Sequence, residues 1–178
     1  MEVKQPGSHF DHLLRQTRMH HMQLSSMADV KANILLTMAS VVITLSLRYI
    51  SDPVLRWTAI VLMTFCLATI VLATYAVMPH LPFTIRKRKS QDVDLPRFNI
   101  LFFGDFAGMA YEDYERAFEK LLNDPSEAYR AQVKEVYQLG VFLARKKYRF
   151  VRLAYLSFII GFLSSGGVLL TNELLRTQ

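Results

Sequence analysis

Three long apolar stretches divide the chain. Residues 32–50, 57–78 and 151–171 contain almost no charge, apart from Arg48 near the end of the first and Arg152 near the start of the third. Each stretch is close to the length of about 20 residues that a helix needs to cross about 30 Å of hydrocarbon. The alternative is a set of buried core helices in a soluble protein, but helices that are apolar on every side are rare in so short a chain. The pattern predicts an all-α integral membrane protein with three transmembrane helices.

The segment before the first span has the spacing of a helix. Apolar or weakly polar residues recur on one face of residues 8–31, and no Pro or Gly separates them from the span. We therefore expect one helix that begins in the cytoplasm and continues into the membrane. Its apolar face consists of Phe10, Leu13, Leu14, Thr17, His21 and Leu24.

A second long helix is predicted before the third span. Asp124 is a suitable N-cap, Pro125 suits the first helical position, and Glu127 can close a capping box. No proline follows, so this helix can run from residue 125 to about residue 170. Residues 111–122 form a shorter amphipathic helix, which we expect to pair with the longer one as a cytoplasmic helical hairpin. The face of the longer helix consists of Tyr129, Val133, Val136, Gly140, Leu143 and Tyr148.

The positions of Lys and Arg predict the orientation. Basic residues follow the second span at 86–89 and precede the third at 145–149, whereas the tail after the third span contains only Arg176. Cytoplasmic loops carry the excess of Lys and Arg, so the N-terminus is expected inside and the C-terminus outside. The predicted organisation is an N-terminal amphipathic helix (1–31), two transmembrane helices (32–78), a cytoplasmic loop and hairpin (79–150), a third transmembrane helix (151–172) and an external tail (173–178).

Composition narrows the class of partner. The net charge is +6, which suits either nucleic acid or an anionic membrane surface. The basic clusters lie beside the spans with few aromatic residues between them, so we expect lipid headgroups and no nucleic acid. The single cysteine, Cys66, excludes a disulfide framework within one chain. The first 30 residues lack an early apolar core, so no cleavable signal peptide is expected.

No set of catalytic residues emerges. The chain has no Gly-rich phosphate loop, nucleophile elbow or zinc-protease motif, and we expect no enzyme, cofactor or metal site. Four N-terminal histidines are the only support for a membrane-bound nucleotide hydrolase. Adjacent His20 and His21 diverge by about 100° on a helix, which makes joint chelation difficult. Surface histidines near the membrane are the plainer interpretation of His9, His12, His20 and His21.

Three other groups are candidates for binding or packing. Asp29, Lys31 and Asn33 at the mouth of the first span suit either interfacial anchoring or a specific contact between helices. The segment 99–106 joins aromatic residues to an amide and follows Arg97. It suits either base stacking with phosphate binding or a hydrophobic plug that docks the loop. Small residues in the third span recur every four positions, which favours close helix packing, within one chain or between copies; they are Ser157, Gly161 and Ser165.

Three segments resemble one family in the same order and spacing. Residues 28–36 (Ala-Asp-Val-Lys-Ala-Asn-Ile-Leu-Leu) resemble the D-x-K-A-(N)-x-L-L opening of the first span in the Pycsar effector transmembrane family. Residues 99–106 (Asn-Ile-Leu-Phe-Phe-Gly-Asp-Phe) resemble its N-L-L-F-F-G-N-F segment, with Asp105 where an Asn is common. Residues 137–148 resemble its Y-x-L-G-x-x-L-x-x-K-Y approach to the last span. Together the resemblance covers residues 25–170.

The resemblance implies a function in bacterial antiphage defence. Members respond to cyclic CMP or cyclic UMP, made by a partner pyrimidine cyclase upon infection, by impairing the inner membrane at the cost of the cell. It implies a protein of the bacterial inner membrane with a sensor in residues 79–150, so the outer side predicted for the C-terminus is the periplasm. The small-residue face of the third span separately makes the protein a candidate homo-oligomer. The alternative is a membrane anchor that recruits a cytoplasmic partner. The candidate nucleotide-binding residues are Arg97, Asn99, Phe102, Phe103, Asp105, Arg145 and Lys146.

Overall fold

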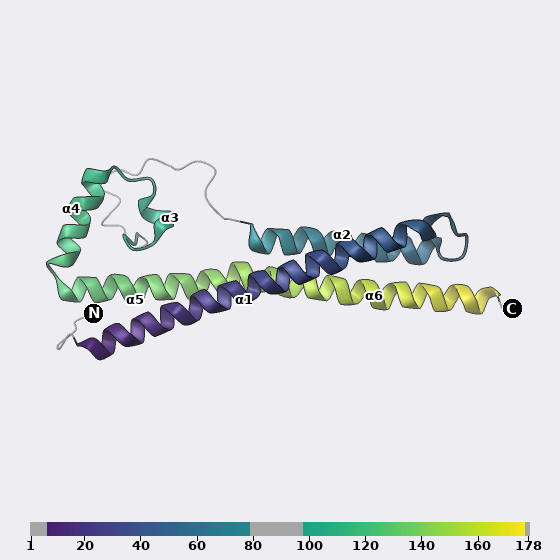
Figure 1. Cartoon of the computed structure of the whole chain (residues 1–178), viewed down its shortest axis with the longest axis horizontal. Helices are drawn as coiled ribbons and strands as arrows, with labels where there is room; N and C mark the ends of the chain where they lie inside the picture. Colours follow the sequence, from purple (N-terminus) through teal and green to yellow (C-terminus); the bar gives the residue numbers. More distant parts are fainter. Residues whose placement is uncertain (1–6, 79–97, 177–178) are drawn as a thin grey trace. The chain divides into compact units, whose positions relative to one another are not determined.

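The computed structural model describes residues 7–78 and 98–176 (Figure 1). These residues are almost entirely helical and contain no strand, which confirms the all-α prediction for the described part of the chain. The elements are α1 (Ser8–Ser46), the 3₁₀ turn η1 (Leu47–Ser51), α2 (Arg56–Val77), α3 (Phe103–Phe106), α4 (Tyr111–Leu122), α5 (Pro125–Phe142), the π-helical segment η3 (Leu143–Tyr148) and α6 (Arg149–Arg176).

Three helical stretches are long and apolar enough to cross a membrane. They are Ser8–Ser51, Arg56–Val77 and Pro125–Leu175, with 44, 22 and 51 residues. The prediction of three membrane-length apolar helices, the first and third of them within longer helices, is therefore confirmed. Only 22% of each apolar window is buried within the protein. An apolar surface of this extent suits contact with lipid. The side of the membrane on which the helices extend stays a prediction.

The chain divides into two compact units, which we describe separately. The polar unit comprises residues 1–23 and 79–142, and the span unit comprises residues 24–78 and 143–178. All three apolar stretches lie in the span unit. The division falls within α1 and at the junction of α5 with η3.

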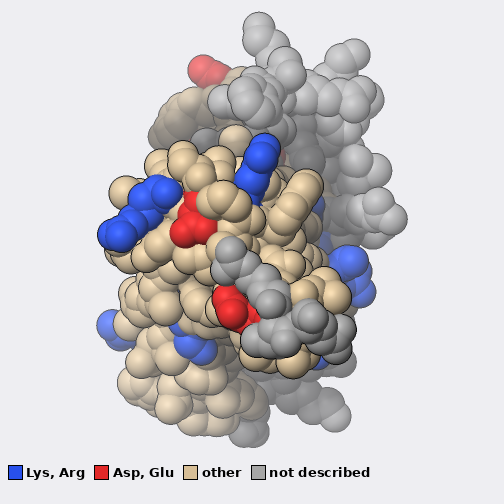
Figure 2. Space-filling model, turned by 90° about the vertical axis from the view of Figure 1, so that its right-hand side faces the viewer, with Lys and Arg blue, Asp and Glu red and all other residues tan. Residues whose placement is uncertain are grey.

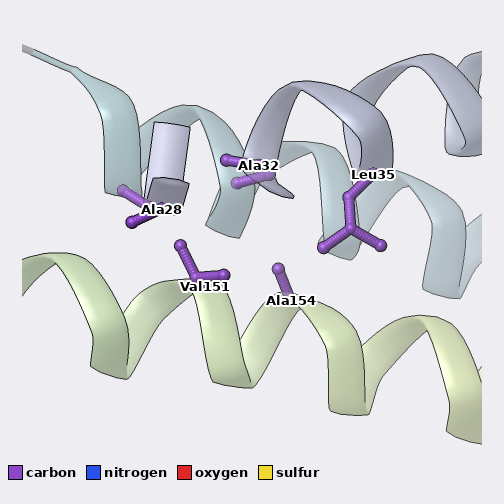
Figure 3. Packing of buried hydrophobic residues seen from close by; sticks show 7 residues of the cluster. Ala28, Ala32, Leu35, Val151 and Ala154 are labelled. Atoms are coloured by element: carbon purple, nitrogen blue, oxygen red, sulfur yellow. The ribbon is translucent and has the colours of Figure 1, made fainter. Parts of the chain in front are cut away.

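Small side chains form the core of the span unit. Figure 3 shows Ala28, Ala32 and Leu35 of α1 facing Val151 and Ala154 of α6. Ala73 and Ala76 of α2 complete this cluster, and all seven residues are buried. Small residues let helix backbones approach closely, which is how spans pack when lipid removes the hydrophobic drive between them.

The start of α5 follows the predicted capping. The Asp124 carboxylate accepts hydrogen bonds from the backbone N–H groups of Ser126 (2.9 Å) and Glu127 (3.2 Å). Glu127 itself forms an ion pair with Arg130 at 2.7 Å, one turn further along α5. The N-cap prediction is confirmed, and Glu127 stabilises the first turn from within the helix.

The contact face of α1 agrees in part with the predicted apolar face. Leu14, Thr17, His21 and Leu24 are half-buried, whereas Phe10 and Leu13 are exposed. The inward positions recur every seven residues, with polar residues in the first half and buried small residues in the second. These positions are Asp11, Arg18, Ser25, Ala32, Ala39 and Ser46. Polar side chains make further contacts in the first half, which the apolar period does not reveal. On the predicted face of the longer helix, Val133 is exposed. The other five residues are half-buried or buried, as predicted.

Charge is sparse at the end of the span unit where α6 finishes. Figure 2 looks onto this end, and uncharged residues cover most of the visible face, with several Lys or Arg side chains and a few acidic ones among them. A surface of this kind is compatible with the interior and edge of a bilayer.

Candidate functional site

Asn99 anchors the loop before α3 to α5 in the polar unit. Its side-chain amide donates hydrogen bonds to the Ala131 carbonyl and to Gln138 Oε1, both at 3.2 Å. Its side-chain oxygen accepts the Leu101 N–H at 3.1 Å. Asn99 is only 3% exposed, so these contacts replace water around a buried amide. The structure thus gives Asn99 a positioning role within the chain.

Asp105 closes the same loop. Its Oδ2 accepts the backbone N–H of Asn99 at 3.0 Å, and its own N–H donates to the Phe102 carbonyl at 2.8 Å. A second connection to α5 comes from Lys134, whose ammonium donates to the Phe98 carbonyl. Phe98 and Ile100 are buried on either side of Asn99. These contacts match the docked-loop alternative more closely than an open aromatic loop.

The structure describes only some of the other predicted ligand residues. Phe102 is half-buried, and Arg97 and the basic cluster at 86–89 lie outside the described residues. Phe103 belongs to α3, but its side chain is also outside the description. Arg145 and Lys146 are exposed on η3 and belong to the span unit, whereas Asn99, Phe102 and Asp105 belong to the polar unit. Neither unit alone therefore brings the whole predicted set together.

Polar contacts join α1 to α5 in the polar unit. The Tyr129 hydroxyl donates to Asp11 Oδ1 at 2.8 Å, and Arg18 forms an ion pair with Glu135. Further along, the His21 ring packs against the backbone of Gly140, where an added Cβ would lie 3.2 Å from the ring. The pairs advance in the same direction along both helices, so α1 and α5 run parallel here (Figure 1).

The Asp11–Tyr129 contact can be followed by titration. The hydrogen bond to the Asp11 carboxylate, followed by burial and the Asp11 charge, raises the pKa of Tyr129 above its ordinary 10.0. A raised pKa means that this contact contributes to stability at neutral pH and is lost as the pH rises past the ordinary tyrosine range. In a phenolate absorbance titration, wild-type protein should show a step for Tyr129 above pH 10, and this step should be absent from Tyr129→Phe. In Asp11→Asn, the Tyr129 step should occur at a lower pH than in wild type. A step at or below the ordinary value in the wild-type protein would contradict the contact.

Two adjacent residues of η3 bind α1 at the start of the span unit. The Lys147 ammonium lies 2.7 Å from both Ser25 Oγ and Asp29 Oδ2. The Tyr148 hydroxyl donates to the Leu24 carbonyl at 3.0 Å. Asp29, which the sequence singled out, thus makes a specific contact between helices, while Lys31 and Asn33 are exposed on α1. We refer to the three residues Ser25, Asp29 and Lys147 as the Lys147 clamp.

Sequence reasoning selected Arg145 and Lys146 and missed Lys147. The signal was present, because Lys147 lies four residues after Leu143 and four before Val151, and both of these are buried. A cation on the inward stripe of a helix needs a counter-ion, and Asp29 is the acidic residue at the same level of α1.

The small residues of α6 pack against α2. A Cβ added to Gly161 would lie 2.5 Å from the Phe65 Cβ, and Ser157 Oγ donates to the Phe65 carbonyl at 3.2 Å. Ser165 is buried and donates to the Phe162 carbonyl of its own helix at 3.0 Å. These contacts are made within one chain.

The histidines do not gather. His9, His12 and His20 are exposed on α1, while His21 lies against Gly140. Within residues 7–78 and 98–176, no group of three or more His, Cys, Asp or Glu side chains is placed to hold a metal ion.

Comparison with protein families identifies the chain's family. The Pycsar effector protein domain, PycTM, matches residues 12–172. Searches of curated proteins and of solved structures found no significant match. The matched region contains all three spans, the Lys147 clamp and the Asn99 loop. Because the match covers most of the chain, this protein belongs to the PycTM family of Pycsar effectors and, with its three membrane-length helices, is a membrane-associated effector of antiphage defence.

Proposed function

We propose that this effector responds to a cyclic pyrimidine nucleotide by impairing the bacterial inner membrane, which arrests or kills the infected cell. The observation that carries the proposal is the family match over residues 12–172 together with three apolar helices of membrane length. The ligand is cyclic UMP or cyclic CMP, made by a partner cyclase. No step requires catalysis by this chain or a cofactor.

The segment 79–150 is the proposed sensor. The excess of Lys and Arg beside the spans supports a cytoplasmic N-terminus, a cytoplasmic segment 79–150 containing the helical hairpin, and a periplasmic C-terminus. The proposed ligand contacts are a base stacked on Phe102 or Phe103 and a phosphate held by Arg97, Arg145 or Lys146. Asn99 and Asp105 hold the loop in place for this contact. Residues from several copies of the chain would together complete this nucleotide site, so the proposed sensor is a homo-oligomer.

Helix continuity supports transmission from sensor to bilayer. α5, η3 and α6 follow one another without a break over 51 residues. A nucleotide can shift such a protein between two states only if it binds one state more tightly than the other. We propose that the state with the higher affinity is the one that impairs the membrane.

Dye release from liposomes tests the proposed function. Purified protein is reconstituted in liposomes loaded with a fluorescent dye, and cyclic UMP, cyclic CMP, cyclic AMP or no nucleotide is added. We expect one of the pyrimidine nucleotides to release the dye and cyclic AMP to have no effect. The same selectivity should appear as dye uptake by cells that express the protein with a cyclase. Absence of release with both pyrimidine nucleotides would remove the proposal.

A membrane anchor for a protein partner is the second candidate. The polar unit exposes large apolar side chains at Tyr111, Leu122 and Tyr137. Such residues suit a protein contact. A stoichiometric protein partner recovered after mild solubilisation, with an intact membrane under all nucleotides, would favour the anchor over the effector.

A further inference from the structure

The Lys147 clamp combines a nearly buried cation with a half-exposed partner. The Lys147 side chain is 12% exposed, whereas the Asp29 side chain is 41% exposed. The ammonium has two short contacts, to Asp29 and Ser25, both at 2.7 Å. An ammonium that loses its counter-ion in a buried position is strongly unfavourable, so it moves toward water instead of remaining in place. Loss of the pair therefore moves η3 away from α1.

The clamp lies next to the buried cluster of small residues in the span unit. Ala28 and Ala32 of α1 and Val151 of α6 are almost fully buried within one turn of Asp29 and Lys147. The contact between these helices depends on close approach of small residues. A displacement of η3 from α1 thus opens the seam that begins at Ala28 and Val151.

The clamp lies on the π-helical segment η3. Successive residues of an α-helix point about 100° apart, and the wider turn of a π-helix reduces this angle. In the wider turn of η3, Lys147 reaches Ser25 and Asp29 while Tyr148 reaches the Leu24 carbonyl at 3.0 Å. Single π-helical turns are uncommon and weaker than α-helical ones, and they occur often at functional sites. η3 therefore depends on its contacts with α1 to keep this form.

We propose that the Lys147 clamp is a latch that holds the span unit in its resting state, and that its release starts the change that impairs the membrane. The gating part of this inference rests on the proposed function. The latch itself does not, because its effect on the packing of α1 against η3 and α6 can be measured without any nucleotide.

The test uses full-length protein in liposomes and two independent readouts. Asp29→Asn and Lys147→Gln each remove the ion pair with little change of shape. The matched control is Glu127→Gln, which removes the exposed pair with Arg130 within α5. The first readout is amide hydrogen exchange in residues 24–35 and 143–154. The second is release of trapped dye without nucleotide.

In both clamp variants, the amide hydrogens of these two segments are expected to exchange faster than in wild type. Dye release is expected to be roughly tenfold faster, a moderate effect because the ion pair is only partly buried. Glu127→Gln should match wild type in both readouts. The exchanged pair Asp29→Lys with Lys147→Asp should return both readouts toward wild type, which separates loss of the pair from damage to either position.

The outcomes separate the latch from the proposed function. Unchanged exchange in both clamp variants overturns the latch, and faster exchange with unchanged dye release overturns its gating role. If cyclic UMP and cyclic CMP fail to release dye from wild-type liposomes, the proposed function fails. Faster exchange and nucleotide-free release in the clamp variants would then still support the latch.

Discussion

A Gly161→Ala protein is expected to lose much of the packing between α2 and α6. The added Cβ would lie 2.5 Å from the Phe65 Cβ and 3.2 Å from its Cγ, which is closer than such atoms approach in folded proteins. The Phe65 Cβ is attached directly to the α2 backbone, so a rotamer change cannot relieve the contact. The helices must move apart, at a cost of about 1–3 kcal/mol for a forced fit in a packed core.

Thermal unfolding in detergent measures this effect. We expect a clear decrease in the midpoint for Gly161→Ala and almost no change for Gly167→Ala, since a Cβ at Gly167 would meet no atom within 4 Å. The two substitutions add the same methyl group to the same helix, so intrinsic helix propensity cancels between them. Equal midpoints for the two variants would show that α6 does not pack on α2 through Gly161.

Replacement of Asn99 by Ala is expected to release the loop before α3 from α5. The substitution removes both donors to Ala131 and Gln138 and the acceptor for the Leu101 N–H. Each buried polar group left without a partner costs about 1–3 kcal/mol. Because Asn99 is 3% exposed, water has little access to replace these contacts. The expected loss of loop stability is therefore larger than for replacement of an ordinary surface amide.

Limited proteolysis and hydrogen exchange over residues 98–106 provide the measurement. Asn99→Ala should be cleaved faster and exchange faster there, and Asn123→Ala is the matched control. Asn123 is exposed, and its amide donates only to the Glu119 carbonyl of its own helix among the described contacts. Loop protection that survives in Asn99→Ala would contradict the anchoring role.

The spans and the start of α5 could be predicted from sequence because their causes are local. An apolar stretch of about 20 residues is enough by itself to predict a membrane-length helix, and Asp124 caps the residues that directly follow it. The inward face of α1 could not be predicted in this way. Its first half is defined by contacts of Asp11 and Arg18 with residues 118 and 117 positions away.

The role of the Asn99 segment illustrates the same limit. Its composition suits both a ligand loop and a docked plug, and only the partners of the amide distinguish the two. Those partners, Ala131 and Gln138, lie 32 and 39 residues further along the chain. Lys147 was overlooked for a related reason, since it is surrounded by basic residues whose common role is at lipid headgroups.

The alanine-lined seam of the span unit has a consequence for the rate of rearrangement. The fully buried residues of the seam are mostly alanines, and larger side chains such as Tyr148, Phe150 and Phe158 pack against its edge while partly buried. Where methyl groups separate two backbones, one helix can slide along the other with little steric obstruction, so we expect the side chains at the edge of the seam to set the barrier for such sliding. Substitution of these edge residues by alanine should therefore speed any rearrangement of α6 against α1, whatever starts it.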